Sequence, residues 1–259
     1  MPELPDVEGF RLTLARHAAG RRIERVQVRD PGVLRGVTAR QLSSRLRGHR
    51  FAWPDRRGKW VLARTDGPVV LMHFGMTGSL RWTGAGAPAE RFERLTFVTD
   101  GGELHYDDMR KLTGVWLAGN DEEAGRFLGS LGPDALAVQR RELAGLLYRR
   151  RATVKALLMD QHVIAGLGNL LTDEILWRAC INPRRPARSL TTREVRRLHA
   201  RMRWVLRASI QAGDVPARPS WLTGVRYQPA ARCPRCRTPL TSARIAGRTC
   251  LWCPRCQGD

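Results

Sequence analysis

The spacing of the cysteines constrains this chain more than any other feature of its 259 residues. Two identical Cys-Pro-Arg-Cys segments begin at Cys233 and Cys253 and end at Cys236 and Cys256, with sixteen residues between them. Each segment can place two thiolates on one tetrahedral ion, and four thiolates leave no open position on it. We therefore predict one structural Zn²⁺ held by these four cysteines, in preference to disulfides. Cys250 is then a spare, half-buried thiol.

The segment between the two cysteine pairs predicts the shape of this zinc finger. Polar and apolar residues alternate along it on either side of Gly247, a pattern typical of a β-hairpin. Arg248 then lies at or just past the tip of the hairpin. A hairpin held by zinc is a stiff support for a cation, although a solvated surface arginine would look the same in sequence.

The charge of the chain points to a polyanionic partner. Lys and Arg number 45 against 24 for Asp and Glu, which gives a formal charge of +21 and a pI near 11.4. A hydrophobic content of 42% with eight Trp excludes a disordered basic tail. Most of the cationic residues are Arg, which binds phosphate with two parallel hydrogen bonds. A GC-rich genome would give the same preference for Arg over Lys. The sequence contains no signal peptide or membrane span, so we expect a cytoplasmic protein.

Hydrophobic periodicity divides the chain into three parts. Residues 1–120 predict a short opening helix that stops at Gly20 and then β-rich runs in two packed layers. Residues 121–213 predict helices, and residues 214–259 a Pro-rich linker followed by the finger. The fold class is therefore a multidomain α and β protein.

Three helices are expected in the second part. Residues 154–164 and 170–180 each form an amphipathic pattern, joined by an Ala-Gly-Leu-Gly-Asn turn. A third helix begins at Thr191, whose spacing to Glu194 fits a capping box, and continues to Gly213.

The N-terminus carries a potential nucleophile. Removal of Met1 would expose the secondary amine of Pro2, and the reference pKa of an α-amino group is about 8, against about 10.4 for Lys. Such amines attack sugar C1′ or carbonyl carbons and form Schiff bases. Glu3 is placed to act as a general acid or base. Many proteins begin with Met-Pro, so this signal is weak by itself.

Two features of the helical part are typical of a phosphate-binding site. The turn from Gly166 to Asn169 opens a helix, so backbone N–H groups and the Asn169 amide can meet an anion there, unless the turn is a plain connection. Residues 149–151 are three arginines at the expected start of the preceding helix, where a cation opposes the helix dipole. A bound phosphate would relieve that repulsion; a solvated charged face is the alternative.

Two loops after predicted strands carry unusual side chains. In the segment His-Phe-Gly-Met-Thr-Gly-Ser-Leu that begins at His73, Met76 lies between two glycines. An apolar side chain on such a turn packs inward or projects as a wedge into a base stack. Arg110 lies in the second loop, within residues 107–111.

These segments together closely resemble the formamidopyrimidine-DNA glycosylase and endonuclease VIII family of base-excision repair enzymes. The matching stretches follow the family order over nearly the whole length: PELPDVE, RRGKWVL, HFGMTGSL, DMRK, LGPDAL, VKALLMDQHVIAGLGN and CPRC…GRTCLWCPRC. The resemblance implies an N-terminal β-sandwich with an opening helix, a helix-two-turn-helix domain and a C-terminal β-hairpin zinc finger.

The resemblance also implies a chemistry. Pro2 would attack C1′ of a damaged nucleotide flipped out of the duplex, displace the base and leave an iminium, with Glu3 protonating the sugar as its ring opens. Successive β- and δ-elimination would then cut the strand on both sides of the abasic sugar. The enzyme would be a bifunctional DNA glycosylase and AP lyase that excises oxidised or ring-opened bases, with no cofactor except structural zinc.

Further residues acquire expected roles by this resemblance. Lys59 and Arg248 match catalytic residues near the phosphates that flank the lesion. Met76 and Arg110 match two of the three residues that fill the gap left by the flipped base. The full set expected to contact DNA is His73, Met76, Arg110, Arg150, Lys155 and Asn169. The expected partner is damaged double-stranded DNA, bound by a cytoplasmic, nucleoid-associated monomer.

Departures from the family pattern concern the substrate. Leu112 stands at the third gap-filling position, where formamidopyrimidine enzymes usually have Phe. The segment 214–232 is shorter than the family loop that closes over 8-oxoguanine, and Asp6 replaces a Glu. The sequence thus leaves open the preferred lesion and the opposite base. Two alternatives remain: a non-catalytic zinc-finger DNA-binding protein of the same fold, and a glycosylase retuned to alkylated or bulky bases.

Overall fold

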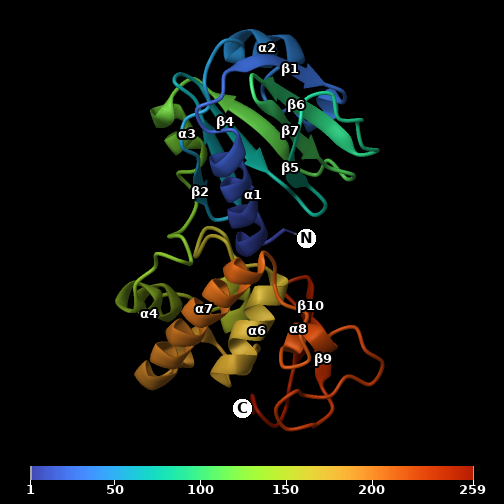
Figure 1. The fold of residues 1–259 in the computed structure, drawn as a ribbon. Helices are drawn as coiled ribbons and strands as arrows, with labels where there is room; N and C mark the ends of the chain where they lie inside the picture. The colour runs from blue at the N-terminus through green and yellow to red at the C-terminus, as the bar shows by residue number, and fades with distance from the viewer. Residues whose placement is uncertain (1, 259) are drawn as a thin grey trace. The chain divides into compact units, whose positions relative to one another are not determined.

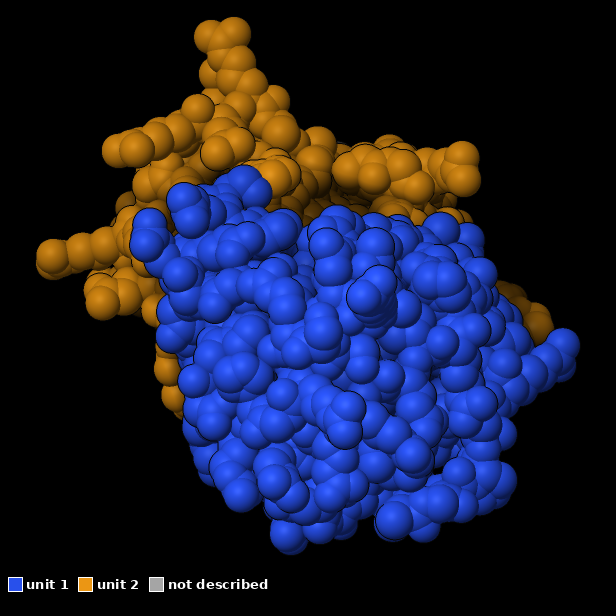
Figure 2. Space-filling view, turned by 90° about the horizontal axis from the view of Figure 1, so that it is seen from above, with its two compact units in different colours: residues 1–2, 6–130 blue, residues 3–5, 131–259 orange. Residues whose placement is uncertain are grey.

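The computed structural model describes residues 2–258. The chain divides into two compact units, coloured separately in Figure 2. The first contains Pro2 and residues 6–130, and the second contains residues 3–5 and 131–258. Residues 214–258, set apart in the sequence as linker and finger, lie in the second unit. No helix among the described residues is long and apolar enough to cross a membrane.

The first unit is built on two four-stranded antiparallel sheets (Figure 1). One sheet has the order β1 (Ile23–Val28), β6 (Glu93–Thr99), β7 (Gly102–Asp107) and β5 (Ser79–Thr83). The other has the order β2 (Asp55–Arg57), β3 (Trp60–Arg64), β4 (Val69–His73) and β8 (Gly114–Ala118). Both sheets contribute buried side chains to one apolar core, including Phe97 and Tyr106 from the first and Val70 and Met72 from the second. The expected β-sandwich is confirmed.

The helices of this unit border the sandwich. The opening helix α1 (Leu4–His17) is present, and its buried Val7 and Leu14 join the core because they share one helical face. Gly20 has a φ of +81°, in the left-handed region that glycine tolerates. The sequence reading missed η1 (Pro31–Val33) and α2 (Ala39–Leu46), although α2 begins at a complete capping box. Helix α3 (Asp121–Phe127) also lies in this unit.

The second unit is helical and ends in a hairpin. Its helices are α4 (Arg140–Tyr148), α5 (Val154–Met159), α6 (Asn169–Ala179), η2 (Ala187–Ser189), α7 (Thr192–Ala212) and α8 (Leu222–Val225). Helix α7 packs against α4 and α6 (Figure 1). The predicted capping box between Thr191 and Glu194 and the stop at Gly213, whose φ is +86°, are both confirmed.

Two expectations for this unit are wrong. The helix expected over residues 154–164 ends at Met159, because Asp160 accepts a hydrogen bond from the backbone N–H of His162 through its side chain and turns the chain. Residues 149–151 do not begin a helix: Arg149 caps the C-terminus of α4, and α5 starts only at Val154. A cation is favourable at a helix C-terminus, so the dipole argument for a phosphate at these arginines fails.

The finger has the expected hairpin form. Strands β9 (Thr241–Ile245) and β10 (Arg248–Trp252) are antiparallel, and Arg248 pairs with Ile245. The intervening Ala246 and Gly247 both have positive φ, 49° and 74°, as a two-residue type I′ turn requires. Arg248 is therefore the first residue past the tip, and it is exposed.

Candidate functional site

Several backbone N–H groups hold the side chain of Glu3 in the candidate site. It is buried, and its carboxylate accepts hydrogen bonds from the N–H groups of Gly168 at 3.0 Å, Leu170 at 2.8 Å and Leu171 at 3.1 Å. The N–H of Leu4 also donates to the carbonyl oxygen of Gly166. The carboxylate thus caps the N-terminus of α6, where the helix dipole favours a negative charge. The backbone N–H groups expected to meet a phosphate are occupied by Glu3, so that part of the expectation is wrong.

Gly168 leaves the space that the Glu3 carboxylate fills. A Cβ added at Gly168 would lie 2.2 Å from Cδ of Glu3 and 2.4 Å from its Oε1. No larger residue fits here unless the carboxylate moves. The glycine therefore has a steric role, distinct from the turn flexibility that the sequence suggests.

Asn169, the first residue of α6, is fixed from two sides. Its Oδ1 accepts a hydrogen bond from Nζ of Lys155 at 2.8 Å, and its Nδ2 donates to the carbonyl oxygen of Thr249 at 3.0 Å. Lys155 is 0% exposed and forms a buried ion pair with Asp173. Lys155 therefore has no exposed surface, and its ammonium group contacts Asn169 and Asp173.

Asp173 connects α6 to the finger. Its Oδ2 accepts hydrogen bonds from Nη1 of Arg226 at 2.6 Å and from the N–H of Leu251 at 3.1 Å. Arg226 also donates to the carbonyl oxygen of Thr249, the neighbour of Arg248. The network of Lys155, Asp173 and Arg226 therefore holds both Asn169 and the start of β10.

Cys250 belongs to this network and not to the metal site. Its thiol donates to Oδ1 of Asp173 at 3.2 Å, and burial together with the carboxylate raises the pKa of this thiol to about 12. The side chain is fully buried, where the sequence reading expected a half-buried thiol.

The remaining four finger cysteines form a separate cluster that fits a tetrahedral ion. The sulfur atoms of Cys233, Cys236, Cys253 and Cys256 all lie within 4.8 Å of one another. The distances from Cys233 to Cys256, 3.9 Å, and from Cys236 to Cys253, 3.5 Å, are close to the edge of about 3.8 Å that Zn–S bonds of about 2.3 Å imply. The indole N–H of Trp177 points at the sulfur of Cys233 at 3.4 Å, a contact that suits a thiolate. The cluster can hold one metal ion.

In the first unit, Lys59 and His73 lie close together. Lys59 is half-buried between β2 and β3, and its neighbour Trp60 pairs with His73 across β3 and β4, with ring centroids 4.8 Å apart. Burial, with the nearby charge of Lys59, lowers the pKa of His73 to about 4. The N–H of Gly75 donates to Nδ1 of His73 at 3.1 Å, so the neutral ring carries its proton on Nε2 and can donate from there.

The two loops beyond β4 and β7 are joined. Nη1 of Arg110 lies 3.1 Å from the sulfur of Met76, and Oγ1 of Thr77 donates to Asp108 at 2.6 Å. Leu112 is 54% exposed, and its Cβ lies 3.8 Å from the position that a Cβ on Gly75 would take. The three expected gap-filling residues, Met76, Arg110 and Leu112, thus belong to one pair of adjoining loops.

The structure also shows the positions of two further residues that the sequence predicted, Pro2 and Arg150. Pro2 is half-buried and directly precedes Glu3 in the chain, whereas Met1 and its expected removal lie outside the described residues. Arg150 is exposed in the loop after α4.

Three important residues, Gly168, Asp173 and Arg226, were not assigned these roles from the sequence. The only signal for Asp173 is an acidic pair, Asp173 and Glu174, inside the apolar pattern of α6. Both acids are buried; Glu174 accepts a hydrogen bond from the N–H of Leu222 at 2.8 Å, and burial raises its pKa to about 7.

Comparison with known proteins defines the class. Residues 1–115 match the formamidopyrimidine-DNA glycosylase N-terminal domain, and residues 131–218 match the formamidopyrimidine-DNA glycosylase H2TH domain. A curated formamidopyrimidine-DNA glycosylase from Symbiobacterium thermophilum is 36% identical over 276 residues, covering 99% of this chain and 89% of the relative.

Solved structures agree with this match. A glycine-to-proline mutant of the Lactococcus lactis enzyme in complex with Fapy-dG-containing DNA matches with a TM-score of 0.90 and 28% identity over 100% of both chains. The same enzyme with DNA containing an oxidized pyrimidine matches with a TM-score of 0.89 and 28% identity, again over 100% of both chains. Fold and site thus define a DNA glycosylase and AP lyase that acts on damaged DNA. The chain belongs to the formamidopyrimidine-DNA glycosylase family.

Proposed function

We propose that Pro2 is the nucleophile of this glycosylase and lyase. The observation that carries the proposal is the anchoring of the next residue: three backbone N–H groups of the α6 N-terminus fix the Glu3 carboxylate. A nucleophile must be held in a near-attack position, and a rigidly bound neighbour restricts the freedom of Pro2.

The chemistry follows from a secondary amine at Pro2. Its lone pair forms a bond to C1′ of the damaged nucleotide, and the bond from C1′ to the base breaks, so that its electron pair leaves with the base, which takes up a proton. The Pro2 nitrogen then gives its N–H proton to the Glu3 carboxylate. Ring opening moves the C1′–O4′ electron pair to O4′, which takes that proton from Glu3. The product is an iminium between Pro2 and C1′.

Strand cleavage proceeds from this iminium. Loss of a proton from C2′ breaks the C3′–O3′ bond in β-elimination, and loss of a proton from C4′ breaks the C5′–O5′ bond in δ-elimination. We assign Lys59 and Arg248 to the phosphates beside the lesion, with Asn169 and Nε2–H of His73 as further donors. Lys155 acts indirectly, by orienting the Asn169 amide. Arg150, exposed and cationic, is proposed as an outlying phosphate contact.

The adjoining loops that contain Met76, Arg110 and Leu112 support a role in binding duplex DNA around a flipped nucleotide. Met76, Arg110 and Leu112 would fill the gap that a flipped nucleotide leaves, because apolar and planar side chains can replace stacking. The exposed Leu112 offers less stacking surface than an aromatic ring.

We further propose that the bases excised are oxidised or ring-opened. This rests on the Lactococcus lactis enzyme, whose structures contain Fapy-dG and an oxidized pyrimidine. Excision of alkylated or bulky bases is the second candidate, favoured by Leu112 and the short segment 214–232. One Zn²⁺ in the four-cysteine cluster would serve as a structural ion, and the enzyme would act as a monomer.

A blocked N-terminus tests this proposal. A variant that retains one residue before Pro2 has an amide where the amine should be, so base excision and strand cleavage should fall to background. Its affinity for a duplex with a stable abasic-site analogue should stay within about threefold, since phosphate contacts supply most of that affinity. Undiminished cleavage by the extended variant would remove Pro2 from the mechanism.

A further inference from the structure

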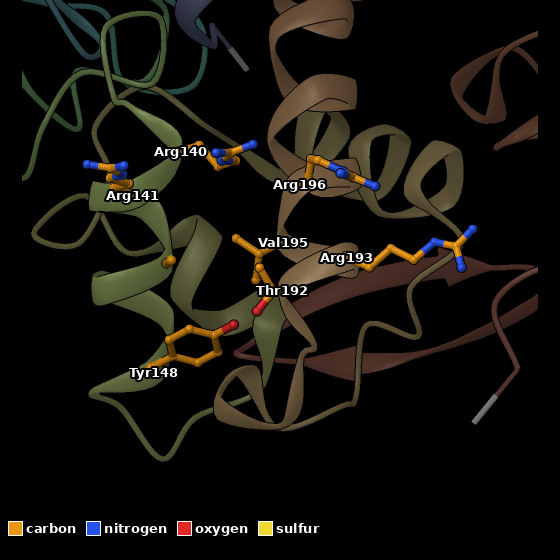
Figure 3. Close-up of a pocket in the computed structure, with 8 residues that line it drawn as sticks. Arg140, Arg141, Tyr148, Thr192, Arg193, Val195 and Arg196 are labelled. Carbon is orange, nitrogen blue, oxygen red and sulfur yellow. The ribbon is translucent and has the colours of Figure 1, made fainter.

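Helices α4 and α7 border an open cavity of about 580 Å³ in the second unit. Its lining includes Arg140 and Arg141 from α4 and Arg193 and Arg196 from α7 (Figure 3). Apolar surface from Ala144, Tyr148 and Val195 completes it. None of the residues described above for Glu3, Asn169 or the finger takes part, so this is a second, separate location.

The four arginines of this cavity lack internal partners. Among residues 2–258, none of their side chains makes a hydrogen bond, an ion pair or a ring contact, whereas the side chains of Arg185 and Arg178 are paired with Glu194 and Glu174. Arg140, Arg141 and Arg193 also lie in the first turns of α4 and α7, where their charge opposes the helix dipole. An anion bound at these two helix ends would offset that unfavourable interaction.

A neighbouring cavity extends the cationic surface. It measures about 440 Å³, is lined by Gln139, His199 and Ala200, and shares Arg140, Arg141 and Arg196 with the first. From Thr192 to Ala200 the α7 side of the two cavities rises about 12 Å along the helix axis. A ligand that uses the whole surface is therefore a chain of anions and not a single small ion.

We propose that the α4–α7 cavity binds a segment of single-stranded nucleic acid, distinct from the lesion-bearing duplex. Single strands are typically bound by a positively charged groove together with an aromatic side chain on which a base stacks. Tyr148, 40% exposed, supplies the ring, and the four arginines supply the phosphate contacts. A duplex would use the arginines but could not insert a base, and an acidic peptide would have no use for the ring.

The test measures binding of a fluorescent oligothymidylate of about eight nucleotides to the full-length protein by anisotropy. A saturating short duplex with an abasic-site analogue is present throughout, so that the lesion site is occupied. Arg193→Glu/Arg196→Glu should weaken oligothymidylate binding at least tenfold and reduce the slope of log K against log salt by about 1.4, because two phosphate contacts are lost. Tyr148→Ala should weaken binding about fivefold or more and leave the salt slope unchanged.

The matched control is Arg201→Glu/Arg207→Glu. It changes the net charge equally, on exposed positions of α7 that line neither cavity, and should keep oligothymidylate affinity within about twofold to threefold. Equal loss in both double variants would mean long-range attraction only and would overturn the proposal. So would displacement of the oligothymidylate by undamaged duplex or by polyglutamate at matched charge concentration, or no binding by the wild type. Strand cleavage at an abasic site, measured on the same protein preparations without the analogue duplex, reports separately on the lesion site.

Discussion

Glu3 shows how one side chain ties catalysis to the local packing of the chain. Its carboxylate occupies the space that the missing Cβ of Gly168 leaves, and three N–H groups hold it there. We expect Gly168→Ala to displace the carboxylate and slow single-turnover strand cleavage about 100-fold, as misplacement by about 1 Å typically does.

The control for this substitution is Gly145→Ala in the middle of α4. A Cβ there meets nothing within 4 Å, so activity should be unchanged and stability slightly higher. Cleavage by Gly168→Ala at the wild-type rate would show that Glu3 needs no such fixed position.

The lowered pKa of His73 predicts in which direction the stability of the folded protein changes with pH. Its folded pKa of about 4 lies below the ordinary value of 6.5, so between these pH values the unfolded chain binds more protons than the folded one. Stability should therefore rise with pH across this window, by up to about 3 kcal/mol from this group. Urea unfolding between pH 4 and pH 7 should show a smaller rise for His73→Gln. An identical pH dependence in both proteins would contradict the neutral, buried imidazole.

At the scale of elements, Asp173 joins α6 to β10. Asp173→Asn keeps the shape of the side chain but leaves Lys155 and Arg226 without their carboxylate. Removing one partner of a buried ion pair typically costs about 3–5 kcal/mol, so the melting temperature should fall. Because Arg248 follows the turn of the same hairpin, cleavage of an abasic duplex should fall more than about tenfold even well below that temperature.

A surface acid provides the comparison for Asp173. Asp214→Asn removes the same charge from an exposed position in the same unit and should leave both the melting temperature and cleavage unchanged. If Asp173→Asn also cleaves normally, the network stabilises the fold without positioning the phosphate contacts.

The elements also show where sequence patterns carry information and where they do not. The capping box at Thr191, the hairpin around Gly247 and the cysteine spacing are local signals, and the structure confirms the elements they predict. The early end of α5 depends on a side chain of Asp160 bonding to its own backbone, which hydrophobic periodicity does not register.

The site was harder to predict for a related reason. Pro2 and Glu3 adjoin in sequence, but the atoms that hold the Glu3 carboxylate lie some 165 residues further along the chain. Backbone N–H groups have no sequence signature, so a helix end that looked free for phosphate proved to be capped from within. Lys155 likewise looked like a surface cation until its partners Asn169 and Asp173 were known.

At the scale of the whole molecule, the proposed site residues are distributed over both units. The first carries Pro2, Lys59, His73 and the paired loops, and the second carries Glu3, Asn169 and the finger. Pro2 and Glu3 are consecutive residues, so the peptide bond between them joins the proposed nucleophile of the first unit to the carboxylate of the second. The charge of +21 suits a DNA glycosylase, because every unit of DNA backbone is an anion.

The central claim is that the Pro2 amine forms a covalent iminium with the sugar. The most direct measurement is borohydride trapping on a duplex with a single abasic site, followed by peptide mapping of the adduct, with the N-terminally extended variant alongside. We predict one adduct that maps to Pro2, cleavage of the unreduced duplex, and neither in the extended variant. An adduct on a lysine, or cleavage with no adduct at Pro2, would contradict the account.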